Sequence, residues 1–492
     1  MIIGGLDVGT TGCKIALYNE NCELLDTYYN EYDAKHQNGH HEIDFTDVRS
    51  GVISILKKAA GEYRIDALGV TSFGETFAML DENDRILAPS MLYTDPRGQG
   101  ECDCLCDNLG EDELTLLTGV KPHPMYSISK IMWHKNNTEA FAKCRRILLG
   151  EDFIVYTLTG KAQIDYSLAA RTAAFDIEKK CWIDKVFETA GIDASLMSDP
   201  VPAGTVAGVI TESVKNELGI DYDITVVNGC HDQVAGMIGS GIFEPDQAMD
   251  GTGTVECIPV ILKKKPTNLD FYEGGYSVVP YLGDLYACYA LSFTGGATLK
   301  WFRDNFAELE WERARKESKN VYAELDKAVS DKPTGILVLP HFAGAATPYM
   351  DNDSRAVIAG LSLEHTSSDV YKALMEGTTY EIRLNCERLA QYGIEFKHMY
   401  ATGGGAASPK WLQIKADILN LPVTSLDALE VGACGTCMLT GVAIGLYKDL
   451  HEAKKHFIKE KKPYLPEKAA EYNPHYARYE KMYDSIRSVI GE

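Results

Sequence analysis

Positive charge is scarce in this sequence of 492 residues. Lysine and arginine total 48 against 71 aspartate and glutamate residues, which gives a net charge of −23. A protein of that charge repels nucleic acid and anionic lipid, so we expect neither as a partner. Any phosphate group that binds here must therefore be held by local amide groups, a lysine or a metal ion.

Long hydrophobic runs and disulfide spacings are also lacking. No stretch approaches the length of a membrane-spanning helix, and the first residues lack the basic and apolar segments of a secretory signal. The 13 cysteines show no disulfide-framework spacing. Cys434 and Cys437 have the spacing of a redox pair but lie among small residues, which indicates helix packing instead. We therefore expect a cytoplasmic protein with reduced thiols and no membrane association.

The length of the chain predicts two domains, because 492 residues exceed what one hydrophobic core accommodates. We place the boundary near residue 245, which gives domains 1–245 and 246–492. Apolar runs over 2–8, 13–18 and 23–29 predict a β-meander with a turn rich in glycine and threonine. A similar turn at 250–255 suggests two α/β domains built on the same plan.

The segment 228–233 (Asn-Gly-Cys-His-Asp-Gln) connects a predicted strand to a predicted helix. This pattern places Asp232 at a loop near the positive end of the helix, which favours an ionised carboxylate at neutral pH. Such a carboxylate can accept a proton from a substrate hydroxyl while the oxygen attacks a phosphorus atom. Asp232 is therefore the candidate general base, although an aspartate in this position can also serve only as a helix cap.

Turns rich in glycine and threonine offer sites for phosphate groups. The segment 7–14 (Asp-Val-Gly-Thr-Thr-Gly-Cys-Lys) combines consecutive amide groups, two hydroxyls and a lysine, and its aspartate could hold Mg²⁺ through water. Further turns at 251–254 and 294–297 fit the same role. Three glycines at 403–405 precede a predicted helix and allow the close approach of an adenosine. Each turn alone is a weak signal, whereas their order is a strong one.

That order, with the residues that fill it, resembles the FGGY family of carbohydrate kinases over nearly the whole chain. The segments 127–133 and 359–377 are similar to the two signatures of the family, and 94–97 and 411–417 are similar to further motifs. The resemblance implies an α/β fold of the two-domain actin-like (ribonuclease H-like) ATPase type, with a nucleotide cleft between the domains. It also implies ATP and Mg²⁺ as cofactors and a small sugar or polyol as the substrate.

The resemblance implies roles for individual residues. Asp232 would be the general base, and Asp7 and Asp232 would face Mg²⁺. The acceptor would contact Glu75, Asp95, Asp232 and Gln233. The residues implied for ATP binding are Thr10, Thr11, Lys14, Gly251, Thr252, Gly295, Gly296, Gly403, Gly404, Gly405 and Ser408.

The identity of the acceptor is the least determined part of this prediction. The segment 72–76 is Ser-Phe-Gly-Glu-Thr, and it lacks the Gly-Gln-Met-His-Gly motif of xylulose kinases. It shares Glu-Thr with the Arg-Glu-Thr of glycerol kinases, and Phe-Gly with the Thr-Phe-Gly-Val-Asp of fuculose kinases. We favour a xylulose-type ketose on overall similarity, with L-fuculose, L-ribulose, glycerol and erythritol as alternatives. Arg171 could meet an acidic group on the acceptor, but we expect it to pair with a surface carboxylate.

Two rival functions belong to other classes. One is a nucleotide-switched interaction protein on the actin-like scaffold, which would need no polar acceptor site such as Glu75 and Asp95 would form. The other is a catalytically silent sugar-binding regulator, against which the presence of Asp7, Lys14 and Asp232 together argues. The kinase is thus the favoured prediction, and a homodimer is an expectation at the level of the family only.

Overall fold

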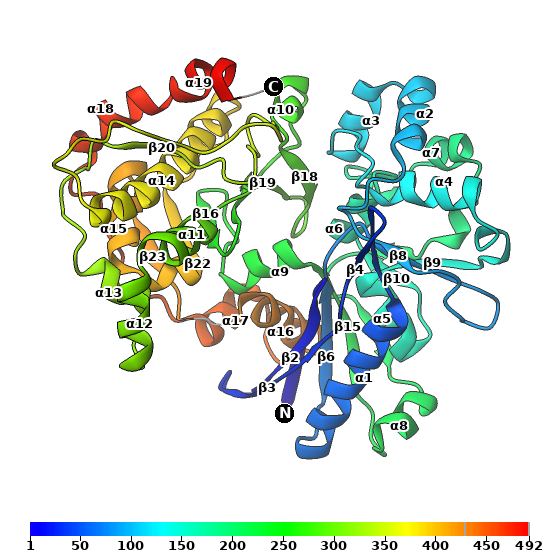
Figure 1. Ribbon diagram of the computed structural model, residues 1–492. Helices are drawn as coiled ribbons and strands as arrows, with labels where there is room; N and C mark the ends of the chain where they lie inside the picture. Colours follow the sequence, from blue (N-terminus) through cyan, green and yellow to red (C-terminus); the bar gives the residue numbers. More distant parts are fainter. Residues whose placement is uncertain (428–429, 491–492) are drawn as a thin grey trace.

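Two six-stranded mixed sheets form the centre of the protein, whose computed structural model describes residues 1–427 and 430–490 (Figure 1). The first sheet consists, in spatial order, of β14 (Val206–Val209), β15 (Thr225–His231), β6 (Ala67–Ser72), β1 (Ile2–Val8), β2 (Gly12–Asn19) and β3 (Leu24–Glu31). The second consists of β18 (Ser277–Pro280), β19 (Tyr286–Ser292), β17 (Glu256–Leu262), β16 (Gln247–Thr252), β22 (His398–Gly403) and β23 (Val423–Ser425).

Five strands of each sheet share the same pairing pattern. Three of them form an antiparallel run, the meander β1–β2–β3 in the first sheet and β16–β17–β19 in the second, where β18 precedes β19 in the chain and pairs with its outer edge. Two strands then join in parallel on the other side of the first strand, β6 and β15 in one sheet and β22 and β23 in the other. The predicted meander is confirmed, and so is the prediction of two α/β domains built on one plan.

The principal helices of the two halves are α1 (Phe45–Glu62), α5 (Gly150–Thr159) and α9 (Asp232–Gly239) in the first, and α14 (Ser367–Gln391), α15 (Pro409–Leu419) and α16 (Val431–Ala443) in the second. The other helices of eight or more residues are α2 (Gln99–Leu109), α3 (Glu111–Thr118), α4 (Ser127–Asn137), α11 (Gly296–Phe306), α12 (Glu308–Lys316), α17 (Leu450–Phe457), α18 (Ala469–Tyr479) and α19 (Met482–Ile490). Within the described part of the chain, no helix has the length and apolar character that crossing a bilayer requires.

The C-terminal tyrosines at 472, 476, 479 and 483 fall at helical spacing, which predicts that they pack in the core. Tyr472, Tyr476 and Tyr479 are buried on α18, and Tyr483 is buried on α19. They pack with Trp411 of α15 in one hydrophobic cluster. The packing interpretation is confirmed, although the stripe spans two helices rather than one.

Helix α16 packs on the first sheet although it follows the last strand of the second. At Gly5 of β1, a Cβ atom would collide with the carbonyl oxygen of Ala433, so only glycine allows the helix to lie this close to the strand. Cys434 and Cys437 are both buried in this helix as free thiols. Their predicted role in packing is therefore confirmed.

Helices α9 and α16 contact each other backbone to backbone. A Cβ on Gly239 would collide with the carbonyl oxygen of Val431, and one on Gly435 would collide with that of Ala235. The segment that begins at Asp232 is thereby held against a helix contributed by the C-terminal half of the chain (Figure 1).

We predict that Gly239→Ala lowers the melting temperature, because the added methyl group would force α9 and α16 apart. Overpacking of this kind costs about 1–3 kcal/mol. Gly61→Ala is the matched control: Gly61 lies in α1 with no atom within 4 Å of an added Cβ. Alanine in a helix is favoured over glycine by roughly 0.5–1 kcal/mol, so the control should melt at the same or a higher temperature. Equal melting temperatures for Gly239→Ala and the wild type would contradict the tight packing.

Candidate active site

The junction of β15 and α9 positions Asp232, which is the first residue of the helix. The register of β15 with β6 shifts between Asn228 and His231, as a β-bulge produces. Within the bulge, Gly229 approaches the carbonyl oxygen of Val70 so closely that a Cβ would collide with it. The bulge changes the direction of the side chains that follow, and glycine is required for it.

A buried hydroxyl fixes the end of β15. The Ser167 Oγ accepts a hydrogen bond from the His231 N–H at 3.0 Å and donates one to Asp165 Oδ1 at 2.9 Å. Asp165 also caps α6 (Tyr166–Ala169) by accepting from two N–H groups of that helix. The residue before Asp232 is thus held by an element 64 residues earlier in the chain.

The ionisation of Asp232 differs from the prediction. Burial, with the charges of Asp7 and Glu75, raises the pKa of its carboxyl group to about 7. The expectation of a fully ionised carboxylate at neutral pH is therefore wrong, because these effects outweigh the position of Asp232 at a helix N-terminus. The side chain is 35% exposed and so remains reachable by a ligand. A base with a pKa near neutrality is well matched to general-base catalysis.

Four buried side chains lie around Asp232: Glu75, Arg171, His231 and Tyr289, which with Asp232 we call the acceptor cluster. Arg171 Nε donates to Glu75 Oε1 at 2.6 Å, and its Nη2 pairs with the same oxygen. The predicted pairing of Arg171 with a surface carboxylate is therefore wrong. The sequence contained no signal for this pair, since its members are 96 residues apart.

The other two residues predicted to bind the acceptor are placed differently. Asp95 is buried, and both of its oxygens accept hydrogen bonds from Arg97, with a further one from the His41 N–H. Although burial opposes ionisation, these bonds hold the pKa of Asp95 at about 2. Gln233 follows Asp232 on α9 and is half-buried. Contact of the acceptor with Asp95 stays a prediction, in which a sugar hydroxyl would compete with Arg97.

The β1–β2 hairpin presents the residues predicted to face the phosphates and the metal ion. Thr10 and Thr11 form its turn, and Lys14 lies opposite Asp7 in the register of the two strands. Lys14 Nζ donates to Glu430 Oε2 at 2.8 Å. Burial raises the pKa of Asp7 to about 6, while Lys14 lowers it. Asp7 in turn raises the pKa of Asp232, which shows that the two carboxyl groups act on each other.

A cavity of about 730 Å³ lies in the C-terminal half of the chain. Five of the residues predicted to bind ATP line it: Thr252, Gly296, Gly404, Gly405 and Ser408. Gly251, Gly295 and Gly403 adjoin these residues in the chain. The sequence did not reveal the lining residues from α11 and α13 (Val321–Asp326), among them Leu299, Lys300, Tyr322 and Asp326. These helices carry no short motif.

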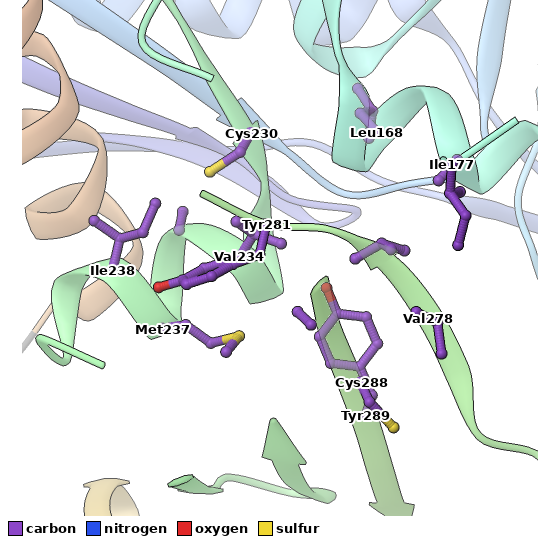
Figure 2. Close-up of a cluster of buried hydrophobic side chains, with 14 of the residues drawn as sticks. Leu168, Ile177, Cys230, Val234, Met237, Ile238, Val278, Tyr281, Cys288 and Tyr289 are labelled. Carbon is purple, nitrogen blue, oxygen red and sulfur yellow. The ribbon is translucent and has the colours of Figure 1, made fainter. Parts of the chain in front are cut away.

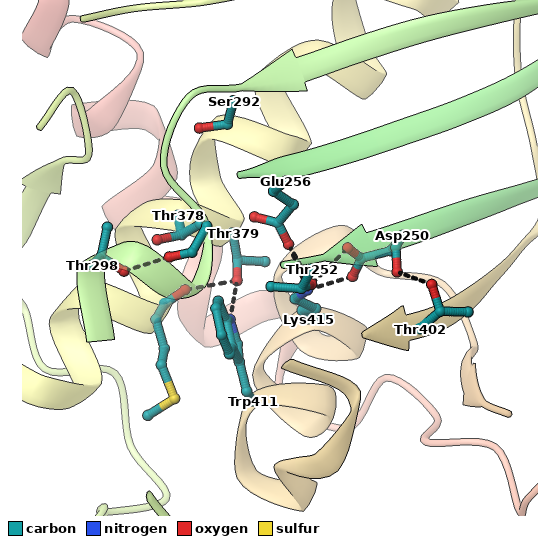
Figure 3. A network of polar contacts seen from close by, with 12 residues as sticks. Asp250, Thr252, Glu256, Ser292, Thr298, Thr378, Thr379, Thr402, Trp411 and Lys415 are labelled. Carbon is teal, nitrogen blue, oxygen red and sulfur yellow. Dashed lines mark hydrogen bonds and ion pairs between the residues drawn. The ribbon is translucent and has the colours of Figure 1, made fainter. Parts of the chain in front are cut away.

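Thr252 lines this cavity and takes part in a network of polar contacts (Figure 3). Its Oγ1 accepts from Lys415 Nζ at 2.7 Å, and Lys415 also binds Glu256 at 2.6 Å and pairs with Asp250. Although burial opposes it, the two carboxylates raise the pKa of Lys415, so the lysine is charged. A Cβ on Gly405 would lie 2.6 Å from the Cβ of Thr252. The turn at the end of β16, the triple glycine and α15 are thus joined into one unit.

Comparison with known proteins identifies the family. The model for the FGGY family of carbohydrate kinases, N-terminal domain, matches residues 2–239, and the model for the C-terminal domain matches residues 251–444. The chain therefore belongs to the FGGY family of carbohydrate kinases.

Individual relatives cover nearly the whole chain. A xylulose kinase from Staphylococcus xylosus is 25% identical over 92% of this chain and 93% of its own. A glycerol kinase from Pseudothermotoga lettingae is 29% identical over 92% and 91%. The solved structure of ligand-bound xylulose kinase from Lactobacillus acidophilus is 22% identical, covers 99% of both chains and gives a TM-score of 0.89. The predicted two-domain, actin-like fold is confirmed.

We predict that Gly404→Val weakens ATP binding at least tenfold by filling the cavity. Gly404 lines the cavity, and the nearest atom to an added Cβ is 4.0 Å away, so the fold has room for the side chain but the ligand does not. Gly100→Val on α2 is the control, because no atom lies within 4 Å of its Cβ. Calorimetric titration with ATP would measure both variants. Wild-type affinity in Gly404→Val would place the adenosine elsewhere.

Proposed function

We propose that this carbohydrate kinase transfers the γ-phosphoryl group of ATP to a hydroxyl group of a ketose or polyol, with a xylulose-type ketose as the favoured acceptor. The observation that carries the proposal is the place of Asp232, at the end of β15, with Asp7 acting on it from the neighbouring hairpin and Glu75 and Arg171 beside it. A protein that only changes conformation with its bound nucleotide would not need the buried pair of Glu75 and Arg171 next to Asp232.

In this mechanism the acceptor hydroxyl donates a hydrogen bond to the ionised Asp232 carboxylate. As the hydroxyl oxygen attacks the γ-phosphorus, its proton passes to Asp232, the bond between the γ-phosphorus and the bridging oxygen breaks, and ADP leaves. The Thr252 turn and the N-terminus of α11 would hold the phosphates through amide groups. Lys14 would release Glu430 and bind the phosphates instead.

Asp7 and Asp232 are suited to hold Mg²⁺. Their carboxyl groups act on each other electrostatically, and a buried Asp232 oxygen has no hydrogen-bond partner among the residues described. Mg²⁺ is commonly held by one or two carboxylates together with substrate phosphates. When bound, the ion neutralises charge on the β- and γ-phosphate oxygens.

A screen of acceptors tests the proposal. ADP release with Mg-ATP should be measured with D-xylulose, L-xylulose, D-ribulose, L-ribulose, L-fuculose, glycerol, erythritol and gluconate, and without a sugar. We expect one ketose to raise ADP release well above the background, and a ketose of the xylulose type to give the highest rate. The relatives named above are called xylulose and glycerol kinases. A preference for glycerol would therefore support the kinase activity but contradict the choice of a ketose as the acceptor.

Asp232→Asn should lower the rate constant for phosphorylation by about 10²–10⁴-fold, because the amide cannot accept the proton. ATP affinity should remain near the wild-type value, since the cavity for the nucleotide is lined by other residues. Asp193→Asn, at the exposed cap of a short helix, is the matched control and should retain full activity. Turnover of Asp232→Asn within threefold of wild type would contradict the assignment of the base.

The pH profile should show the raised pKa of Asp232. The pKa of Asp232 in the folded protein is about 7. Asp232 therefore becomes protonated as the pH falls through 7, and kcat/KM for the acceptor should decline there. Glu75→Gln removes one of the charges that raise this pKa, so its acid limb should lie at lower pH. An acid limb near pH 4 in both proteins would show that the titrating base is not Asp232 with its raised pKa.

A further inference from the structure

Arg171 reaches the acceptor cluster through space that a glycine leaves open. Arg171 lies in the 3-10 helix η2 (Ala170–Thr172), whereas Glu75 follows strand β6. A Cβ on Gly74 would lie 3.1 Å from Arg171 Cγ and 3.2 Å from His231 Nε2. A side chain at position 74 would press on both groups, so Gly74 leaves the room that Arg171 occupies.

Glu75 is held in an uncommon backbone conformation. Its φ is +64°, in the left-handed region that side chains other than glycine rarely adopt. Ser127 Oγ donates to its carbonyl oxygen at 2.6 Å, which together with Arg171 fixes both its main chain and its side chain. Both contacts from Arg171 fall on Oε1. Within the residues described, no group donates a hydrogen bond to Oε2, which leaves that oxygen for a ligand hydroxyl.

Two buried donors near Glu75 have no partner in the described part of the chain. These are Arg171 Nη1 and the hydroxyl of Tyr289, on side chains that are only 7% and 5% exposed as residues. Figure 2 shows that Tyr289 directs its hydroxyl from β19 toward the segment with Cys230 and Val234, which flanks Asp232. Buried donors are normally hydrogen-bonded, since an unpaired one loses its contact with water without compensation. Oxygen atoms of a ligand would satisfy them.

The charges of the site disfavour a second negative group. The charge of Arg171 is balanced by Glu75, at 2.6 Å from Nε. The cluster holds no other arginine or lysine. A carboxylate on the acceptor would therefore find no uncompensated cation, whereas a carbonyl or hydroxyl oxygen needs only the unpaired donors.

We propose that Arg171 and Glu75, with the Tyr289 hydroxyl, select an uncharged acceptor. In this arrangement Arg171 Nη1 and Tyr289 donate to a carbonyl or hydroxyl oxygen of the sugar, and Glu75 Oε2 accepts from a neighbouring hydroxyl. Ketoses and polyols satisfy this pattern, whereas aldonates bring a carboxylate for which the cluster has no uncompensated cation. The inference rests on the proposed kinase function and names the class of acceptor that the site admits.

The first part of the test compares acceptors of equal length with the wild-type enzyme. D-Xylulose, D-ribulose and xylitol form the uncharged series, and D-xylonate and D-ribonate form the aldonate series. We expect kcat/KM to be at least tenfold higher for the best uncharged compound than for either aldonate. Turnover of an aldonate above the uncharged series would overturn the inference while leaving a carbohydrate kinase in place. Turnover of no compound in either series, nor of any compound in the wider acceptor screen, would contradict the proposed function, and the inference with it.

The second part assigns the selectivity to the residues. Glu75→Gln removes one negative charge and leaves Arg171 unbalanced, so the ratio of kcat/KM for aldonate over ketose should rise at least tenfold. Arg171→Lys retains the charge but loses Nη1, and Tyr289→Phe loses only the hydroxyl. Each should raise the acceptor KM by about tenfold and leave the KM for Mg-ATP within twofold.

Arg49→Gln is the control, because Arg49 forms a comparable pair with Glu217 at the surface. It should leave both KM values and the ratio unchanged. An equal loss of ketose and aldonate turnover in Glu75→Gln would show that the pair only supports the fold, and would overturn the inference. Wild-type acceptor KM in both Arg171→Lys and Tyr289→Phe would also overturn it.

Discussion

The crowding of negative charge around the end of β15 is the constraint on which the rest of the site depends. Burial makes the loss of the Asp232 proton costly, and the charges of Asp7 and Glu75 raise that cost further. Together they give Asp232 a pKa near neutrality and make the position suitable for a base and for a divalent cation. The single balancing cation in the acceptor cluster, Arg171, is itself paired with Glu75.

The two halves of the chain meet around this group of charges. Helix α9, which begins with Asp232, contacts α16 through Gly239 and Gly435. Helix α16 in turn lies on β1, whose end carries Asp7. On the other side, Lys415 joins the turn of β16 to α15 beside the cavity of the C-terminal half. The proposed base and the proposed phosphate turns are therefore fixed by packed backbone and buried ion pairs.

Local sequence was sufficient to predict the parts of the site that lie on one turn or strand end. The Asp7 hairpin, Asp232 and the triple glycine each follow a strand with a recognisable pattern, and the strand pairing confirms the hairpins. Arg171 could not be predicted, because its pairing with Glu75 depends on how η2 packs against Gly74. The raised pKa of Asp232 also could not be predicted from the sequence, because it is set by burial and by charges on other elements.

The pKa of Asp232 itself tests the central claim most directly. Aspartate labelled with ¹³C at the carboxyl carbon would allow the resonances of the protein to be titrated by NMR, and Asp232→Asn would assign the resonance of interest. The account predicts that the resonance missing from the variant titrates near pH 7 in the wild type. An Asp232 resonance that titrates near pH 4 would contradict the account, because the carboxylate would then be solvated and free of the charges that define the site.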